Sequence, residues 1–98
     1  MSYLDELASA VKGAVPEGVE IPDDAHELFV LYAVLVRTCG EHTTARDVHD
    51  AWSAWMGAKD PSHESLVPFE ELPPDVQSED APFVRAIRTV ASRTKGPS

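Results

Sequence analysis

The sequence is poor in cysteine and in long hydrophobic runs. Cys39 is the single cysteine of the 98 residues, so no disulfide can form within the chain. The longest apolar run starts at Leu28 and ends at Val36, and these nine residues are too few to cross a bilayer. The acidic, amphipathic N-terminus differs from the basic start and apolar stretch of a secretory signal. We therefore expect a soluble, cytoplasmic protein that has no membrane contact.

The sequence also lacks the short motifs that carry well-known chemistry. It has no glycine-rich phosphate loop, no G-x-S-x-G nucleophile motif and no cysteine pair. His26 and Glu27 would begin the zinc-protease pattern H-E-x-x-H, but Val30 stands where the second histidine is required. No two of the four histidines are four residues apart on a helix face. We expect no catalytic residues, no metal site and no cofactor, and hence no enzymatic activity.

Acidic residues are absent from the last 18 positions. All 17 acidic residues precede residue 81, whereas four of the eight basic residues follow it: Arg85, Arg88, Arg93 and Lys95. With a net charge of −9, the chain repels a phosphate backbone, so we expect no direct nucleic-acid binding. The basic face of the last helix remains a rival surface for an acidic partner.

Apolar periodicity predicts an all-α fold, a small bundle of about four helices in one domain of residues 1–95, with a frayed tail at 96–98. Ser2 is expected to cap the first helix, which ends near Val15. The second helix is expected to begin around residues 22–24 and to stop at Gly40. Thr44 opens a third helix that ends at Gly57. A short helix at 75–79 precedes the last one, which starts near residue 80.

The second helix is apolar on every side between Leu28 and Val36. A helix of this kind is normally buried all round. In a chain of this length it is either the central helix or a helix that offers one face to another copy. Because three short helices cannot easily cover such a run, we expect a homodimer through the helix at residues 28–36.

A proline-rich, irregular segment crosses from the third helix to the last one. Its apolar residues Leu66 and Phe69 flank Pro68, and the third helix carries Trp52 and Trp55 on one stripe. We expect these four large apolar side chains to be structural anchors, with Leu66 and Phe69 packed on the tryptophans. The outward residues of the segment would then form a partner-binding rim: Glu64, Val67, Glu70 and Glu71.

Two resemblances concern the same part of the chain. The stretches HDAWSAW and HESLVPFEELPPDVQSED, within residues 48–82, resemble a ryanodine-receptor-type repeat. The positions that match its pattern are His49, Trp52, Leu66, Val67, Pro68, Phe69 and Leu72. The whole chain is also similar to a family of small uncharacterised proteins of actinobacteria and their phages. The first resemblance implies an interaction module, the second a small factor that acts on a host protein, and neither implies catalytic residues.

Together these observations predict a non-enzymatic protein-interaction module whose partner is another protein. The alternative is an acidic regulator that mimics nucleic acid or sequesters a basic protein. Capture through an apolar surface would be insensitive to salt, whereas capture by charge mimicry would be lost as salt rises.

Overall fold

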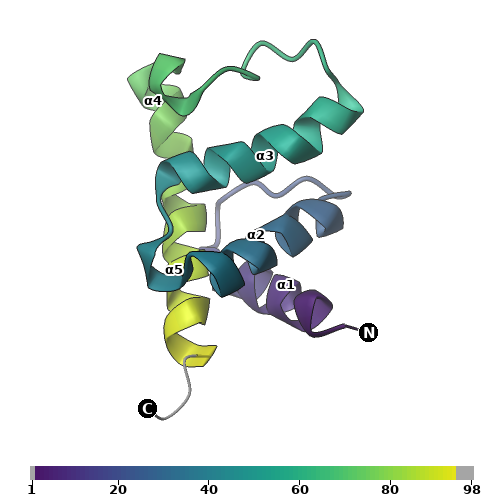
Figure 1. The fold of residues 1–98 in the computed structure, drawn as a ribbon, viewed down its shortest axis with the longest axis vertical. Coiled ribbons are helices and arrows are strands. Elements are labelled where there is room, and N and C mark those ends of the chain that lie inside the picture. Colours follow the sequence, from purple (N-terminus) through teal and green to yellow (C-terminus); the bar gives the residue numbers. More distant parts are fainter. Residues whose placement is uncertain (1, 95–98) are drawn as a thin grey trace.

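In this computed structural model, residues 2–94 are described and form an all-α bundle (Figure 1). The α-helices are α1 (Tyr3–Ala14), α2 (His26–Thr38), α3 (Ala45–Lys59), α4 (Pro74–Gln77) and α5 (Ala81–Thr94). Three 3-10 turns join them: η1 (Gly40–His42), η2 (Phe69–Glu71) and η3 (Ser78–Asp80). Because α4 is a single turn, the prediction of about four helices is confirmed. The expected tail at 96–98 lies outside the described residues.

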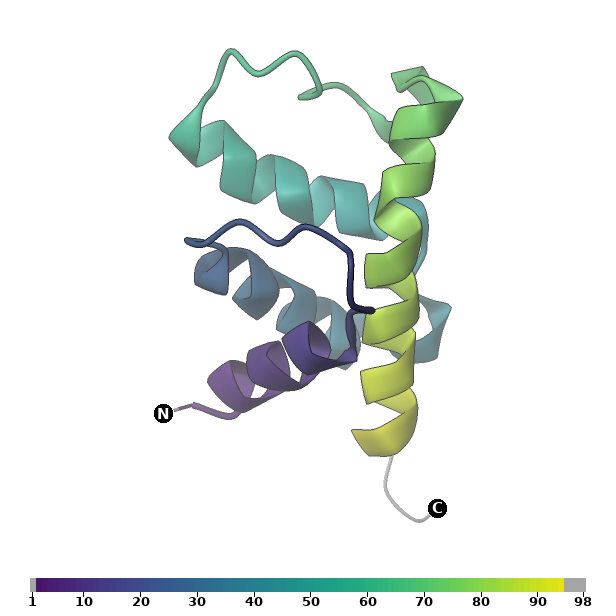
Figure 2. The same cartoon turned by 180° about the vertical axis from the view of Figure 1, so that it is seen from behind.

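Helix α5 holds the bundle together by crossing the other long helices. It contacts α1, α2 and α3, which follow one another along its length (Figure 1). The segment that joins α1 to α2 runs across the opposite face of the molecule, beside α2 and α3 (Figure 2). Within residues 2–94, no helix has both the length and the apolar character that a membrane crossing requires.

Local capping signals fix both predicted helix starts. The Ser2 hydroxyl accepts a hydrogen bond from the Asp5 amide, and the Asp5 carboxylate accepts one from the Ser2 amide. Thr44 and Asp47 form the same reciprocal pair at the start of α3. Such caps use amides that have no partner inside the helix, so they define where it begins.

The two ends of α2 and the C-terminal end of α3 can also be compared with the predicted boundaries. Gly40 follows α2 with a φ of 57°, the left-handed conformation expected of a helix-ending glycine. Helix α2 begins at His26 rather than at residues 22–24, of which Asp23 and Asp24 form a turn. Helix α3 continues through Gly57 to Lys59, so the predicted end at Gly57 is wrong. The Lys59 ammonium pairs with Asp24 and lies 4.3 Å from the Trp55 ring centroid, contacts that favour the continuation of the helix past Gly57.

The apolar core lies where α1, α2 and α5 meet. Its largest fully buried side chains include Val11 from α1, Phe29 and Tyr32 from α2, and Ile87 and Val90 from α5. Phe29 and Tyr32 make an edge-on ring contact with centroids 5.4 Å apart. Full burial of one such side chain contributes roughly 1.5–3 kcal/mol, so this junction is a major source of stability.

The apolar run of α2 is central to this core. Leu28, Ala33 and Val36 are buried with the two aromatic residues above, and Val30, Leu31 and Leu35 pack partly against the same core. Within residues 2–94, the large hydrophobic side chains that stay exposed are Tyr3 at 61% and Val34 at 38%. One chain therefore covers most of the surface from which a dimer was predicted, and the homodimer stays a prediction.

Candidate functional site

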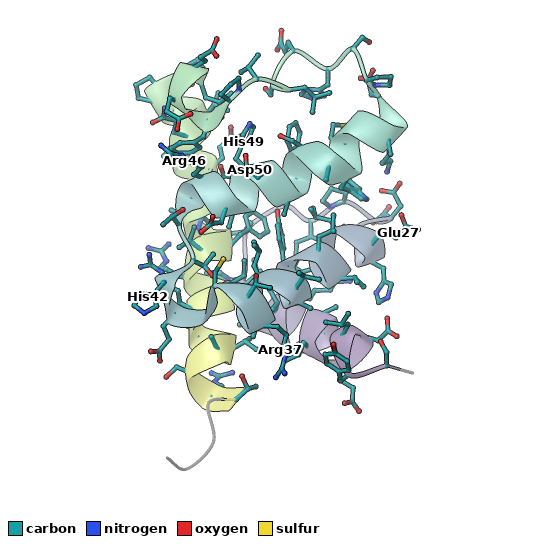
Figure 3. All side chains as sticks on the ribbon, in the orientation of Figure 1. Glu27, Arg37, His42, Arg46, His49 and Asp50 are labelled. Carbon is teal, nitrogen blue, oxygen red and sulfur yellow. The ribbon has the colours of Figure 1, made fainter. Side chains whose placement is uncertain are left out.

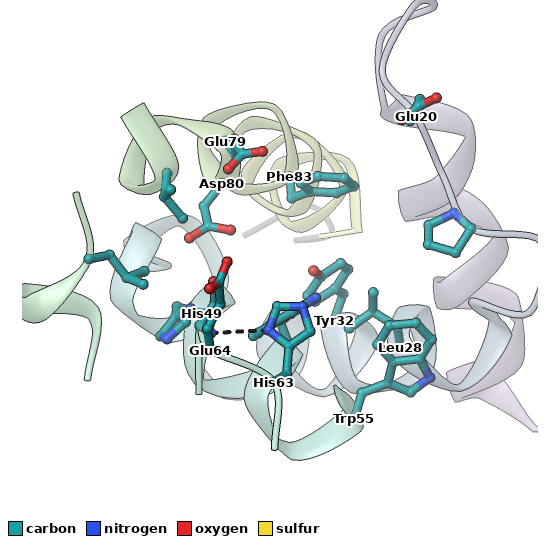
Figure 4. Close-up of a pocket in the computed structure, with 15 residues that line it drawn as sticks. Glu20, Leu28, Tyr32, His49, Trp55, His63, Glu64, Glu79, Asp80 and Phe83 are labelled. Carbon is teal, nitrogen blue, oxygen red and sulfur yellow. Dashed lines mark hydrogen bonds between the residues drawn. The ribbon is translucent and has the colours of Figure 1, made fainter. Parts of the chain in front are cut away.

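A cavity of about 470 Å³ opens between α2, α3, the start of α5 and the crossing segment (Figure 4). Its apolar walls are Pro22, Leu28, Trp52, Trp55, Leu72, Val76 and Phe83. Its polar walls are Glu20, Tyr32, His49, His63, Glu64, Ser65, Glu79 and Asp80. This volume lies within the range of about 300–1,000 Å³ that is typical of small-ligand sites.

Trp52 stands between two histidines. Its ring is nearly parallel to that of His49 in α3, with centroids 5.6 Å apart, and edge-on to that of His63, with centroids 5.1 Å apart. His63 belongs to the crossing segment, so this three-ring stack ties the segment to α3. The Trp52 indole is only partly buried and remains available to a ligand.

His49 is the polar link between α3 and the crossing segment. Its side chain is 3% exposed, and Nε2 donates a hydrogen bond of 2.7 Å to the Val67 carbonyl oxygen. A carbonyl can only accept, so the ring proton is on Nε2. The Ser53 hydroxyl lies 3.4 Å from the same nitrogen. Figure 3 shows His49 on the side of α3 that faces the segment.

His63 is held by its own segment. Its Nδ1 accepts a 3.0 Å hydrogen bond from the Ser65 amide, the contact drawn as a dashed line in Figure 4. In a neutral His63 ring the proton is therefore on Nε2. Because one nitrogen of each histidine is engaged with backbone, both rings are held in fixed orientations.

Asp80 brings a carboxylate into the cavity at the junction of η3 and α5. Burial raises the pKa of Asp80 to about 6, the nearby His49 opposes this rise, and the negative charge of Glu79 adds to it. Among residues 2–94 no hydrogen bond or ion pair to the Asp80 carboxylate is found. A half-buried carboxylate without a partner is costly to ionise.

Tyr32 is the most deeply buried polar side chain on the cavity wall. It is 2% exposed, and no residue of the described chain hydrogen-bonds to its hydroxyl. Burial raises the pKa of Tyr32 strongly, and the negative charge of Asp80 acts in the same direction. Figure 4 shows Tyr32, His63 and Asp80 around the same space.

The predicted partner rim divides into two parts. Glu64 lines the cavity, and the carbonyl of the half-buried Val67 accepts the bond from His49. Glu70 and Glu71 are exposed and do not line the cavity, and Glu70 forms an ion pair with Arg46 in α3. The structure thus brings Glu64 together with the tryptophans and places Glu70 and Glu71 away from them.

The predicted anchors also differ in their surroundings. Trp55 is buried and Trp52 half-buried, and both line the cavity. Phe69 is half-buried, with its ring centroid 6.2 Å from that of His49. Leu66 is half-buried, whereas Leu72 further along the segment is 6% exposed. The aromatic neighbour of Phe69 is therefore His49, a residue not selected as an anchor from the sequence.

The cavity walls combine aromatic rings with groups that can hydrogen-bond to a ligand. Three or more histidine, cysteine or carboxylate side chains placed to hold a metal ion do not occur together within residues 2–94. The two histidines each use a nitrogen for backbone contacts, which suits them for fixing shape. The other polar groups on the wall are carboxylates, the Tyr32 phenol and the Ser65 hydroxyl, and the aromatic faces of the tryptophans and Phe83 lie beside them.

Fold and cavity define a small all-α domain with an aromatic, acidic pocket at one end of its bundle. The chain matches the family described as "Domain of unknown function (DUF7701)" over residues 2–92, and it belongs to that family. No curated protein and no solved structure matches it.

Proposed function

We propose that this chain is a non-enzymatic protein-interaction module that receives a segment of a partner protein in the cavity. The observation that carries this proposal is the combination of two tryptophans with converging polar groups in one pocket of about 470 Å³. Buried aromatic anchors surrounded by polar groups are the usual energetic centre of a protein interface. The resemblance to small phage proteins makes a host protein the expected partner.

The arrangement of the acidic residues favours this module over general charge mimicry. A nucleic-acid mimic presents its carboxylates along an exposed surface, in the manner of a phosphate backbone. Here Glu20, Glu64 and Glu79 are exposed and Asp80 is half-buried, and all four border one hollow that Trp52, Trp55 and Phe83 also line. Carboxylates and aromatic rings around the same hollow support recognition of one group at a defined position.

Peptide selection tests the proposal without knowledge of the partner. A random peptide library is panned against the immobilised chain, and the enriched peptides are mapped by backbone amide shifts of ¹⁵N-labelled protein. We expect saturable shifts around Trp52, His63 and Asp80. A selection that enriches no peptide, or peptides whose shifts lie elsewhere on the molecule, contradicts the proposal.

A matched pair of charge reversals provides the control for that selection. Glu64→Lys changes an exposed residue on the cavity wall, and Glu71→Lys changes an exposed residue away from it. Both alter the net charge equally, so long-range electrostatics affect them alike. Loss of peptide binding in the first variant alone supports the cavity as the site, whereas equal loss in both contradicts it.

A further inference from the structure

The charge of the cavity walls indicates which chemical class of ligand the cavity would bind. Four carboxylates contribute to the walls, from Glu20, Glu64, Glu79 and Asp80, and within residues 2–94 no lysine or arginine does. The ion pairs that lysine and arginine make in the described chain join Arg46 to Glu70 and Lys59 to Asp24, neither of which is a cavity pair. Like charges around one hollow repel one another, and a cation placed among them removes that repulsion.

A second observation, independent of these acids, points to a ligand that donates hydrogen bonds. Tyr32 lies on a core helix, is 2% exposed, and its hydroxyl lines the cavity without a hydrogen-bond partner among residues 2–94. Within residues 2–94 no fully enclosed side-chain nitrogen or oxygen atom lacks a partner, so this hydroxyl is open to the cavity. A hydroxyl oxygen can accept a bond from a ligand N–H, and the neighbouring Asp80 carboxylate can only accept.

The aromatic walls favour a flat cation. Trp52, Trp55 and Phe83 line the same space. The chain already holds cations against aromatic rings: Lys59 Nζ lies 4.3 Å from the Trp55 centroid, and the Arg37 guanidinium carbon lies 5.6 Å from that of Tyr3. A guanidinium is planar, stacks on aromatic faces and is more weakly hydrated than an ammonium, so it loses less on entering such a pocket.

We propose that the cavity binds the guanidinium of an arginine side chain from the partner, with the Asp80 carboxylate and the Tyr32 hydroxyl as acceptors. This inference rests on the proposed interaction function and names the group that the module recognises. The aromatic walls contact the face of the guanidinium, and Glu64 and Glu79 add negative potential at the entrance.

Protonation of the pocket sets the pH range of this binding. Because burial raises the pKa of Asp80 to about 6, the carboxylate is ionised at pH 7.5 and increasingly neutral below pH 6. His49 and His63 also face this space, together with Glu20, Glu64 and Glu79. Protonation of the Asp80 carboxylate removes negative charge from the pocket, so binding of a guanidinium weakens as the solution is acidified.

Butylguanidinium is a direct probe, because it reproduces the arginine side chain without a peptide. Both tryptophans of the sequence line the cavity, so their two indole N–H signals report its occupancy. At pH 7.5 we expect saturable shifts of both signals with butylguanidinium and none with butylurea, its neutral isostere. Asp80→Asn should weaken the binding about tenfold or more, since a charged hydrogen bond contributes about 1.5–3 kcal/mol.

Two further variants separate the effect of the cavity groups from the effect of net charge. Glu71→Gln removes one exposed negative charge away from the cavity and should leave the affinity within about twofold. Tyr32→Phe should weaken butylguanidinium binding severalfold while retaining the fold, because its hydroxyl has no internal partner. Three results would each overturn the guanidinium assignment. The first is an equal loss of butylguanidinium affinity in Asp80→Asn and Glu71→Gln. The others are equal shifts with butylurea and stronger binding of butylammonium.

The same set of measurements separates this inference from the function on which it rests. If the selected peptides bind in the cavity but contain no arginine, the interaction module stands and the guanidinium assignment fails. If no peptide binds in the cavity at all, the module itself fails.

Discussion

The two ends of the bundle are built on different principles. At the junction of α1, α2 and α5, buried side chains such as Phe29, Ile87 and Val90 are apolar and close-packed. Around α3, the crossing segment and η3, the buried or half-buried residues include His49 and Asp80 as well as tryptophans. The first end gains free energy from every group that it buries, whereas the second buries a carboxylate whose charge no described residue pairs.

This difference has a consequence for the stability of the two ends. An unpaired carboxylate in a half-buried position lowers the free energy of unfolding at neutral pH. Stabilising changes are therefore expected to be easiest at the cavity and hardest at the core junction. The following predictions, in descending order of expected effect, test that division.

The largest effect is expected from Ile87→Ala at the core junction. Ile87 is 0% exposed, and deletion of its side chain should lower the free energy of unfolding by about 2–5 kcal/mol. Urea melts followed by circular dichroism measure this change. A loss below about 1 kcal/mol would mean that the junction is loosely packed and that the comparison drawn above is wrong.

A smaller effect is expected from His49→Phe, which keeps an aromatic ring but removes the donor to the Val67 carbonyl. We expect a loss of about 1–2 kcal/mol, because a half-buried carbonyl is left without its partner. Hydrogen exchange should also speed up in the crossing segment more than in α5. Ser53→Ala, which removes the more distant 3.4 Å contact, is the control and should cost less than about 0.5 kcal/mol.

Asp80→Asn should act in the opposite direction and stabilise the protein. The folded-state pKa of Asp80 is about 6 against a usual 3.8, so between these values the folded chain holds a proton that the unfolded chain has released. The contribution of this group to stability therefore falls as pH rises through that window. With an allowance for solvent screening, the free energy of unfolding of the variant should be higher than that of the unmodified protein by about 1 kcal/mol at pH 7.5 and unchanged at pH 3.5. Thermal melts at both pH values measure this, and a destabilised variant at pH 7.5 contradicts it.

The smallest effect is expected from Glu70→Gln. Its ion pair with Arg46 joins two side chains that are more than half exposed, so its loss should change stability by less than about 0.5 kcal/mol. Peptide and butylguanidinium affinities should also be unchanged, because Glu70 does not line the cavity. Weaker binding in this variant would extend the site onto the outer rim that the sequence suggested.

Local signals explain which parts of the fold could be predicted. The N-caps Ser2 and Thr44 and the helix-ending Gly40 depend on neighbours within a few residues, and all three were predicted from the sequence. The end of α3 depends instead on Lys59 contacts with Asp24 and Trp55, of which Asp24 is remote in sequence. A glycine at position 57 could not reveal those contacts.

The candidate site was predictable only in part, for the same reason. Trp52, Trp55 and Glu64 could be selected from residue type and spacing, and they line the cavity. Tyr32 and Asp80 were not selected, since each looks ordinary in its own helix and gains its role by meeting the other across the fold. Arg88 shows the converse: expected on an open basic face, it donates a 2.7 Å hydrogen bond from Nε to the Thr43 carbonyl oxygen. A charge reversal there would disturb the fold as well as the surface.

The most direct test of the whole account is the titration of the Asp80 carboxyl group, followed by the ¹³C shift of its side-chain carbon. In the free protein we expect a pKa of about 6, and in saturating butylguanidinium a pKa lowered from that value, because a bound cation favours the ionised form. Both values should be unaffected by Glu71→Gln. A free-state pKa near the ordinary 3.8, or a raised value that butylguanidinium does not change, would contradict the claim that this end of the bundle keeps an unpaired carboxylate for a cationic partner.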